Sequence, residues 1–568
     1  MKGNDIMYIL GIWDGHDAGA AIIKGNKILV AINEERITRR KLHVGFPVNS
    51  IKACLDYLKI KPSDIQAVAV STSDFAKTLT RYFPFFKENY YKFRRRMTEK
   101  PAFVHLRRNL KYKLTEINSS RLTRFLTKEW FRKQLKKIGF KDFNLYLVEH
   151  HQAHAVAATF CSGMKKMLTI TIDGIGDGLS GTVNVFKDGK FERISNISGK
   201  DSLGIFFEQI TNLLGMRELE DEGKVMALSD FAYPIDEKKN KMLDFFEVNG
   251  MNIKAKYSVS KQCSLLSRML WNTQREQFAY MAQYTIEKKM LELFKNSINA
   301  TGMKDVCWSG GVASNIKANM RIRLESGLKN WFVFPHMGDG GLALGAAMQI
   351  NFELNNISSY DFDNIYFGTD YKEDYIEKEL KKHKMPYSIQ DNISKEVGNL
   401  ISSGEIILWF QDRMEYGPRA LGDRSILTLA SRKELKDKLN IMVKKRDWFQ
   451  PFCPTILKED AKKFIGDTNG FDKFMTMAYT TMKEARPKIE AVMNVDNSIR
   501  PQILGNENKK YRRVIEQVKI NTGDGIILNT SFNIHGYPIV MTPEDAIKSF
   551  KITKAKYLAI GNFLVEQR

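Results

Sequence analysis

Cysteine is scarce in this chain of 568 residues, which contains only five. The five are dispersed and form no Cys-x-x-Cys pair, so the sequence indicates neither a disulfide framework nor a thiolate zinc site. They are Cys54, Cys161, Cys263, Cys307 and Cys453. Because this usage fits a reducing compartment, we expect a cytoplasmic protein.

Long apolar runs are also lacking. No stretch of about 18 consecutive apolar residues occurs, and the first residues contain no basic segment followed by an apolar one. We therefore expect neither secretion nor membrane spanning. Hydrophobic residues at 43% and charged residues at 27% exclude the polar bias of a disordered chain. A chain of this length is too long for one hydrophobic core, so at least two domains are expected.

Acidic residues are outnumbered by basic ones, 65 to 88, which gives a formal net charge of +23. Such an excess suits anionic partners, namely phosphorylated small molecules, nucleic acid or acidic lipid. Residues 81 to 140 hold 18 Lys/Arg and 4 Asp/Glu, with aromatic residues between them. We interpret this segment as a helical insertion with a solvated basic face. A surface for an anionic acceptor, a membrane or nucleic acid is the alternative.

The chain contains an internal repeat. Residues 8 to 32 and 167 to 194 each read as apolar strand, Asp-Gly turn, apolar strand, Lys-containing turn and third strand, which predicts a duplicated α/β domain. The glycine-rich turns let backbone amides face a phosphate while a carboxylate holds a metal. Together the two turns indicate a nucleotide cleft between similar lobes, although one Asp-Gly turn can also serve a hairpin alone.

The remaining sequence predicts further α/β structure. Helical periodicity covers residues 202 to 228 and 274 to 300, and short apolar strands cover 306 to 308 and 331 to 335. The second strand leads through HMGDGG into an Ala-rich helix, an arrangement that can bind an anion. Polar residues 355 to 364 indicate a linker. From about residue 370 we expect a separate α/β unit, with strands at 405 to 410 and 525 to 532.

Histidines gather in the sequence EHHQAHAVAA. His150 and His154 lie four residues apart in a segment that favours helix, so both imidazoles would share one face. Such a pair can bind a transition metal, and Asp173 and Asp339 could complete the site. This donor set is compatible with iron, manganese or zinc. Histidines that cap or pack are the alternative.

Two further features suggest roles in catalysis and nucleotide binding. His16 stands inside the first Asp-Gly turn and could take a proton from an acceptor hydroxyl, although it could also only bond the turn's backbone. In the loop SGGVASN, small residues let amides approach a nucleotide, and a tight strand-to-helix connection would look the same. The candidate nucleotide-binding residues are Gly310, Gly311, Ser314 and Asn315.

The later unit contains several cations near glycines and polar side chains. Guanidinium groups bind phosphate oxygens bidentately, so this composition indicates a pocket for polyphosphate or an acyl phosphate. A solvated basic surface is the alternative. The candidate residues are Arg419, Arg424, Lys444, Arg446, Arg500, Ser531 and Asn533.

Taken together, these motifs resemble the O-carbamoyltransferase family that includes the tobramycin, cephamycin and nodulation-factor carbamoyltransferases. The matching strings are GHDAGA, EHHQAHAVAA, TIDGIGDG, DEGKVMALS, SGGVASN, GDGGLALGAA, GPRALGDRSIL, NTSFNIHGYPIV and TPEDA. The resemblance implies that residues 1 to 355 form a duplicated actin/Hsp70-type α/β domain similar to threonylcarbamoyl transferase, which carries the insertion. Residues 356 to 369 would be a linker, and 370 to 568 an α/β domain similar to threonylcarbamoyl-adenylate synthase.

The resemblance also implies a reaction in two steps. ATP, with Mg(2+), and carbamoyl phosphate would form carbamoyl adenylate in the second domain, and the first domain would transfer carbamoyl to a hydroxyl of a sugar, antibiotic or glycan. His150, His154, Asp173 and Asp339 match the metal ligands, with Fe(2+) the expected ion, and His16 matches the base. The seven candidate residues of the later unit match the adenylating pocket. A homodimer is one assembly to expect.

The sequence departs from the family pattern at two places. Gln450 stands where some relatives have arginine, so one phosphate contact is absent or supplied elsewhere. Asn494, Asn497 and Ser498 stand where relatives commonly have a histidine and Gly-Thr. Two other functions are alternatives: a tRNA-modifying threonylcarbamoyl transferase, which the basic insertion would suit, and a non-catalytic nucleotide-binding module. The adenylating domain disfavours the first, and the intact metal-ligand set disfavours the second.

Overall fold

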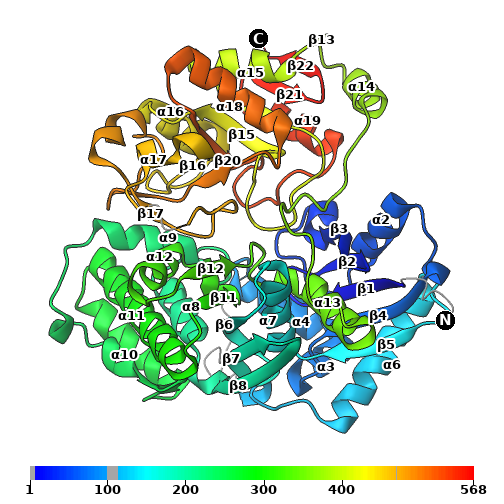
Figure 1. The fold of residues 1–568 in the computed structure, drawn as a ribbon, viewed down its shortest axis with the longest axis vertical. Helices are drawn as coiled ribbons and strands as arrows, with labels where there is room; N and C mark the ends of the chain where they lie inside the picture. The colour runs from blue at the N-terminus through cyan, green and yellow to red at the C-terminus, as the bar shows by residue number, and fades with distance from the viewer. Residues whose placement is uncertain (1–6, 99–112, 468–469, 568) are drawn as a thin grey trace. The chain divides into compact units, whose positions relative to one another are not determined.

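The computed structural model describes residues 7–98, 113–467 and 470–567. The chain divides into two compact units (Figure 1). The first contains Met1–Glu34 and Leu42–Phe362, and the second contains Glu35–Lys41 and Asp363–Arg568. Within the described residues, no helix has the length and apolar character needed to cross a membrane.

The first unit is built from two five-stranded sheets with the same topology. In each sheet, three antiparallel strands are extended by two parallel ones, and the strand orders are β3-β2-β1-β4-β5 and β8-β7-β6-β11-β12. This repeat confirms the predicted duplicated α/β fold. The strands are β1 Tyr8–Trp13, β2 Gly19–Lys24, β3 Lys27–Asn33, β4 Ile65–Ser71, β5 Asn144–Val148, β6 Met167–Gly176, β7 Leu179–Lys187, β8 Lys190–Ser198, β11 Asp305–Ser309 and β12 Asn330–Val333.

Helices surround these sheets, and β9 Phe246–Asn249 and β10 Asn252–Ala255 form a separate two-stranded hairpin. The helices of residues 34–355 are α1 Glu34–Thr38, α2 Val48–Leu58, α3 Phe75–Tyr82, α4 Pro84–Arg94, α6 Arg121–Lys137, α7 His150–Cys161, α8 Leu203–Leu213, α9 Glu222–Leu228, α10 Val259–Trp271, α11 Arg275–Thr301, α12 Ile316–Glu325 and α13 Leu342–Asn355. The predicted insertion contains helices α4 and α6, and its residues 99–112 lie outside the described part of the chain.

Helix α13 packs against both β1 and α7 because glycines remove side chains from the contacts. A Cβ at Gly11 would lie 1.8 Å from the carbonyl oxygen of Ala343, and one at Gly345 would lie 2.1 Å from that of Ala153. Such separations are far below any van der Waals contact. The glycines therefore place the loop that precedes α13 close to the start of α7.

Two elements differ in extent from the sequence prediction. The helix predicted over residues 202 to 228 is interrupted after Leu213, where Gly215 adopts a left-handed conformation with φ of 82°. Strand β6 continues to Gly176 through an irregular register between Ile172 and Gly176, so the predicted turn at 173 to 178 is shorter. Asp173 consequently lies within the irregular end of a strand.

The second unit contains a mixed eight-stranded sheet of order β13-β22-β21-β14-β15-β20-β16-β19. Helices α15 and α18 pack together, and their apolar side chains meet Trp409, Leu427 and Ile527 of the sheet in one buried core. The strands are β13 Tyr387–Ile389, β14 Ile407–Phe410, β15 Arg424–Leu429, β16 Cys453–Leu457, β19 Gln502–Leu504, β20 Ile526–Ser531, β21 Tyr557–Ile560 and β22 Phe563–Glu566, with β17 Tyr479–Thr480 and β18 Ser498–Ile499 forming a separate pair.

The helices of the second unit are short, and the longest has 14 residues. They are α14 Glu373–Lys382, α15 Ile393–Ser402, α16 Lys433–Lys438, α17 Ala461–Phe464, α18 Lys509–Thr522 and α19 Pro543–Ile552. A π-helical turn, Leu439–Lys444, follows α16 and carries Lys444 at its end.

Candidate functional site

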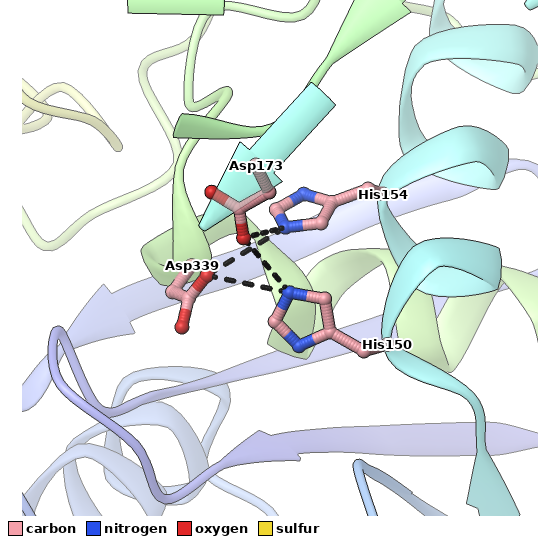
Figure 2. Close-up of side chains that lie close together, drawn as sticks. All are labelled: His150, His154, Asp173 and Asp339. Atoms are coloured by element: carbon pink, nitrogen blue, oxygen red, sulfur yellow. Dashed lines mark hydrogen bonds and ion pairs between the residues drawn. The ribbon is translucent and has the colours of Figure 1, made fainter. Parts of the chain in front are cut away.

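Four side chains from three separate segments converge in the first unit (Figure 2). His150 and His154 lie one turn apart on α7, Asp173 lies near the end of β6, and Asp339 lies in the loop before α13. All four are buried, and their candidate ligand atoms lie within 4.8 Å of one another. The structure thus brings together the four residues that the sequence analysis grouped as metal ligands.

The distances between these atoms describe one shared centre. His150 Nε2 lies 3.0 Å from Asp173 Oδ2 and 3.6 Å from Asp339 Oδ1, and His154 Nε2 lies 3.6 Å from each of the same two oxygens. His154 Nε2 is buried without a hydrogen-bond partner. Because a buried polar atom without a partner is costly, this nitrogen fits an ion better than packing.

Neighbouring groups orient the candidate ligands. His150 Nδ1 lies 3.2 Å from the hydroxyl of Thr72, which leaves Nε2 directed at the carboxylates. The amide of Gly311 donates to Asp173 Oδ1 at 2.7 Å, so Asp173 Oδ2 faces the histidines. A Cβ at residue 311 would lie 2.6 Å from that same Oδ1. Glycine is therefore required at this position for the carboxylate to keep its place.

The charges of the cluster reinforce one another. Burial by itself lowers the pKa of His150, but the carboxylates of Asp339 and Asp173 outweigh it and raise that pKa to about 9. Burial raises the pKa of Asp173, but the hydrogen bond with His150 and the nearby imidazole of His154 hold that pKa well below its usual range. The two carboxylates thus favour a cation at the histidine nitrogens, which is the preference that a bound metal ion satisfies.

The third histidine of this motif has a structural role. His151 Nε2 donates to the carbonyl of Leu179 at 3.1 Å, and its Nδ1 lies 2.9 Å from the hydroxyl of Thr171. Burial, followed by the neighbouring charge of His150, lowers the pKa of His151 to about 4. This imidazole is therefore neutral and fully occupied by protein contacts.

His16 lies beside the cluster. Its Nδ1 is 3.4 Å from Asp339 Oδ2 and 3.4 Å from the hydroxyl of Tyr91. Trp13 Nε1 donates to the His16 carbonyl at 2.6 Å, which fixes the turn. Burial lowers the pKa of His16, although Asp339 opposes this effect. A neutral imidazole next to a carboxylate can accept a proton.

Tyr91 was not identified by the sequence reasoning. It lies on α4, in the basic segment where the motifs are weakest, and an aromatic residue there reads as a packing contact. The only signal was its place among the aromatic residues of that segment.

Asp14 is the counterpart of Asp173 in the first copy of the repeat, and it is neutralised by protein cations. Arg81 contacts both of its carboxylate oxygens at 2.9 Å, and Lys77 Nζ lies 3.5 Å from Oδ1. Burial raises the pKa of Asp14, but Arg81 and then Lys77 outweigh it and hold that pKa far below its usual range. Of the two equivalent carboxylates, only Asp173 faces histidines.

The glycine loop that follows β11 is engaged by protein groups. Gly310 has φ of 100°, and a Cβ there would lie 2.2 Å from the carbonyl oxygen of Ile172. Ser314 Oγ donates to the carbonyl of Gly311 at 2.7 Å. Asn315 caps α12 and exchanges hydrogen bonds with Gln283. Contact of this loop with a nucleotide stays a prediction.

In the second unit, the ammonium group of Lys444 is surrounded by oxygen atoms. Its Nζ donates to the carbonyl and hydroxyl of Ser531 at 2.7 and 3.1 Å, and to the carbonyl and side-chain oxygen of Asn533 at 3.0 and 2.7 Å. Burial, followed by the charge of Arg446, holds the pKa of Lys444 well below its usual range. Three of the seven candidate residues thus form one network.

Three arginines gather around Cys453. Arg500 Nε and Nη2 lie 3.0 and 2.9 Å from its Sγ, and Arg446 lies over the ring of Phe452 at 4.3 Å. Burial and the charge of Arg500 lower the pKa of Arg419, and burial also lowers that of Arg446. Guanidinium groups close enough to oppose one another's charge would be stabilised by a bound anion.

Arg424 makes its side-chain contacts with the protein interior. Its side chain is fully buried on β15 and lies over the ring of Phe410 at 3.7 Å. Its guanidinium donates to backbone carbonyls, including those of Gln411, Asp423 and Asp412. These contacts hold the loop between β14 and β15. The sequence shows the charge of this residue but not the direction of its side chain.

The positions that depart from the family pattern are also held by protein contacts. Gln450 Nε2 donates to Asp447 at 3.2 Å. Asn494 Nδ2 donates to the hydroxyl of Ser498 at 3.1 Å, and Asn497 has a left-handed backbone with φ of 62°. Asparagine tolerates that conformation better than most residues, so it suits this tight turn.

Comparison with known proteins gives matches along most of the chain. The family description Carbamoyltransferase N-terminus matches residues 8–348, and Carbamoyltransferase C-terminus matches residues 398–567. Uncharacterized protein MJ1051 of Methanocaldococcus jannaschii is 32% identical over 98% of this chain and 99% of its own length. Nodulation protein NolO of Bradyrhizobium diazoefficiens is 32% identical over 74% of this chain and 79% of its own length.

Nodulation protein NolNO of Sinorhizobium fredii is 29% identical over 97% of this chain and 79% of its own length. Among solved structures, full-length HypF in its phosphate- and nucleotide-bound form matches with a TM-score of 0.37 and 14% identity. The match covers 63% of this chain and 57% of that one.

Proposed function

Because this chain belongs to the carbamoyltransferase family, we propose that it forms carbamoyl adenylate from ATP and carbamoyl phosphate and transfers the carbamoyl group to a hydroxyl. The acceptor would be a small or sugar-containing molecule, in line with the nodulation proteins among its relatives. The single observation that carries this proposal is the convergence of two imidazoles and two carboxylates beside His16.

We assign His150, His154, Asp173 and Asp339 as ligands of a divalent metal ion, with Fe(2+) the ion that family membership favours. The fit is supported by the nitrogen and oxygen donors and by the buried His154 Nε2, which lacks another partner. When bound, such an ion supplies positive charge that stabilises negative charge on the adenylate phosphate.

His16 is the proposed general base of the transfer step. With hydrogen on Nδ1, the imidazole faces the carboxylate of Asp339, and Nε2 is left to accept the proton of the acceptor hydroxyl. The acceptor oxygen forms a bond to the carbamoyl carbon, the bond from that carbon to the phosphate oxygen breaks, and AMP leaves. Asp339 stabilises the imidazolium that results.

The adenylation step is assigned to the cationic group of the second unit. Arg419, Arg446 and Arg500 would bind phosphate oxygens of ATP with its Mg(2+), and Lys444 would be oriented by Ser531 and Asn533. Hydrolysis of carbamoyl phosphate releases inorganic phosphate and leaves carbamate. A carbamate oxygen then attacks the α-phosphorus of ATP, and pyrophosphate leaves. Arg424 would support the adjoining loop from within the core.

The proposal is tested by incubating the protein with ATP, Mg(2+) and carbamoyl phosphate and analysing the mixture by mass spectrometry. We expect pyrophosphate and carbamoyl adenylate to appear together, and pyrophosphate to be absent when carbamoyl phosphate is omitted. A protein that binds ATP but never releases pyrophosphate would contradict the adenylation step. Acceptors are then screened for the carbamoyl mass increase.

A further inference from the structure

Exposed apolar side chains are concentrated in one part of the first unit. Of the 24 large hydrophobic side chains exposed in the described residues, ten lie between Phe75 and Phe125. Five of the six exposed phenylalanines are among them. Single exposed apolar residues are ordinary, but such a concentration marks an interaction surface.

Helix α3 presents its apolar face to solvent and buries its polar face. Phe75, Leu79 and Tyr82 are spaced as one helical stripe, and all three are exposed. Thr78 and Arg81 point the other way and are buried. A helix at the surface of a globular protein normally buries its apolar face and exposes its polar face, so the pattern of α3 is reversed.

The neighbouring helices show the same reversal. On α4, Phe85 and Phe86 are 71% and 69% exposed, whereas the buried residues are Lys87 and Arg94. Phe125, on the first turns of α6, is also exposed, whereas Thr123 and Thr127 of the same turns are buried.

These helices form one continuous surface. Thr78 Oγ1 lies 3.0 Å from Thr127 Oγ1, and the hydroxyl of Tyr82 donates to the carbonyl of Leu126 at 3.0 Å, so α3 and α6 lie side by side. Helix α4 follows α3 after Phe83. We call the exposed residues Phe75, Leu79, Phe83, Phe85, Phe86 and Phe125 the aromatic patch.

Strong positive charge adjoins the aromatic patch. Helix α6 has seven Lys/Arg and one acidic residue. Arg121, Arg124 and Lys128 lie on one of its faces, in the turns that also carry Phe125. A partner that covers this surface must therefore offer an apolar phase beside negative charge.

We propose that the aromatic patch and the basic face of α6 dock this protein on the surface of an anionic lipid bilayer. Aromatic rings are favoured at the boundary between headgroups and acyl chains, and lysine and arginine bind anionic headgroups beside them. A second copy of this chain is a poorer occupant, because its own basic helix would face this one. Docking of this kind lies beyond the proposed carbamoyl transfer and does not depend on it.

A cavity of about 660 Å³ opens beside the aromatic patch. Its walls include Tyr82, Trp130, Lys133 and Lys137, together with the acidic residues Glu88 and Glu129. The ring faces suit a sugar, and the cations suit a phosphate, which are the parts of a lipid headgroup. Asp14 also lines the cavity and lies two residues from His16, so the docked surface adjoins the proposed transfer site.

The test is co-sedimentation of the full chain with vesicles of phosphatidylcholine alone or with phosphatidylglycerol. We expect binding to the anionic vesicles, weakened by salt, and little binding to the neutral ones. F85S/F86S should lower the partition coefficient by about tenfold or more, because two rings no longer enter the interface. R121E/R124E should abolish the preference for anionic vesicles.

The matched control is Trp271→Ser, which removes a 90% exposed aromatic ring outside the aromatic patch and should bind as the unchanged protein does. Thermal unfolding verifies that each variant is folded. Equal vesicle binding by F85S/F86S and the unchanged protein would overturn the proposal. So would light scattering that shows a dimer which F85S/F86S converts to monomers, because the patch would then be covered by a second copy.

Discussion

His154 is the residue that best separates a metal site from a packed core. Its Nε2 is buried and lacks a hydrogen-bond partner, so an ion would supply the missing interaction. We expect His154→Ala to reduce the bound metal from about one ion per chain to a small fraction of that. The measurement is elemental analysis of the purified protein, and His383→Ala, in the second unit, is the control. Unchanged metal content in His154→Ala would contradict the assignment.

Gly311 should affect the affinity of the site for a metal ion, although it is not a proposed ligand. The Cβ of alanine would lie 2.6 Å from Asp173 Oδ1 and displace that carboxylate. We expect Gly311→Ala to weaken metal binding by about tenfold or more, as changes that displace a ligand's support do. Metal titration of the stripped protein measures the effect. Gly223→Ala introduces the same methyl group where no atom lies within 4 Å and should bind normally.

His16 should be needed for one step only. It lies beside the cluster of the first unit, whereas adenylation is assigned to the second. We expect His16→Ala to release pyrophosphate at the unchanged rate and to lose at least about a hundredfold in carbamoyl transfer, the usual contribution of a general base. Parallel assays of both products measure this. Loss of both steps together would remove His16 from the proposed role.

The sequence identified the four grouped residues because each lies in a short motif whose chemistry can be read without a structure. His150 and His154 share a helical face, and Asp173 and Asp339 are each followed directly by glycine in a short motif. Tyr91 could not be found in this way, because its contact with His16 joins residues 75 positions apart. Arg424 was found as a charged residue, but its burial was not predictable. A charged residue in a glycine-rich motif gives no sign that its side chain points into the core.

At the scale of elements, the loop between β14 and β15 tests the difference between a structural and a binding arginine. Arg424→Met would leave several buried carbonyls without a donor, and we expect it to destabilise the second unit by about 2 kcal/mol or more. Arg419→Met should cost less than about 0.5 kcal/mol but lower pyrophosphate release by at least about tenfold. Chemical denaturation and the pyrophosphate assay distinguish the two. A stable but inactive Arg424→Met would place this arginine in the pocket instead.

The repeated strand pattern was predictable because alternation and turn residues recur over 8 to 32 and 167 to 194. The break after Leu213 was not, because the apolar period continues across it. Residues 214–221 nevertheless leave the helix, and Gly215 and Leu219 both adopt positive φ. Strand β6 also exceeds its predicted end, since its irregular register lets pairing with β7 resume at Gly176. Local periodicity thus predicts which elements form better than where they stop.

At the scale of the whole molecule, the two proposed centres lie in different units, so metal removal should separate the steps. The metal is removed with a chelator, the chelator is removed by dialysis, and Mg(2+) is added back. We expect this treatment to abolish carbamoyl transfer and to leave pyrophosphate release intact. Adding Fe(2+) should restore transfer. Loss of pyrophosphate release that Mg(2+) cannot restore would show that the ion also serves adenylation.

The neutralised carboxylate of Asp14 gives the duplicated unit its functional asymmetry. Two copies of one hairpin provide two equivalent acidic positions, and without Arg81 both could compete for a single cation. The guanidinium pairs with one of them, so only Asp173 is left to face the histidines. Arg81, the first residue of the basic segment, thereby makes the two halves of the repeat chemically unequal.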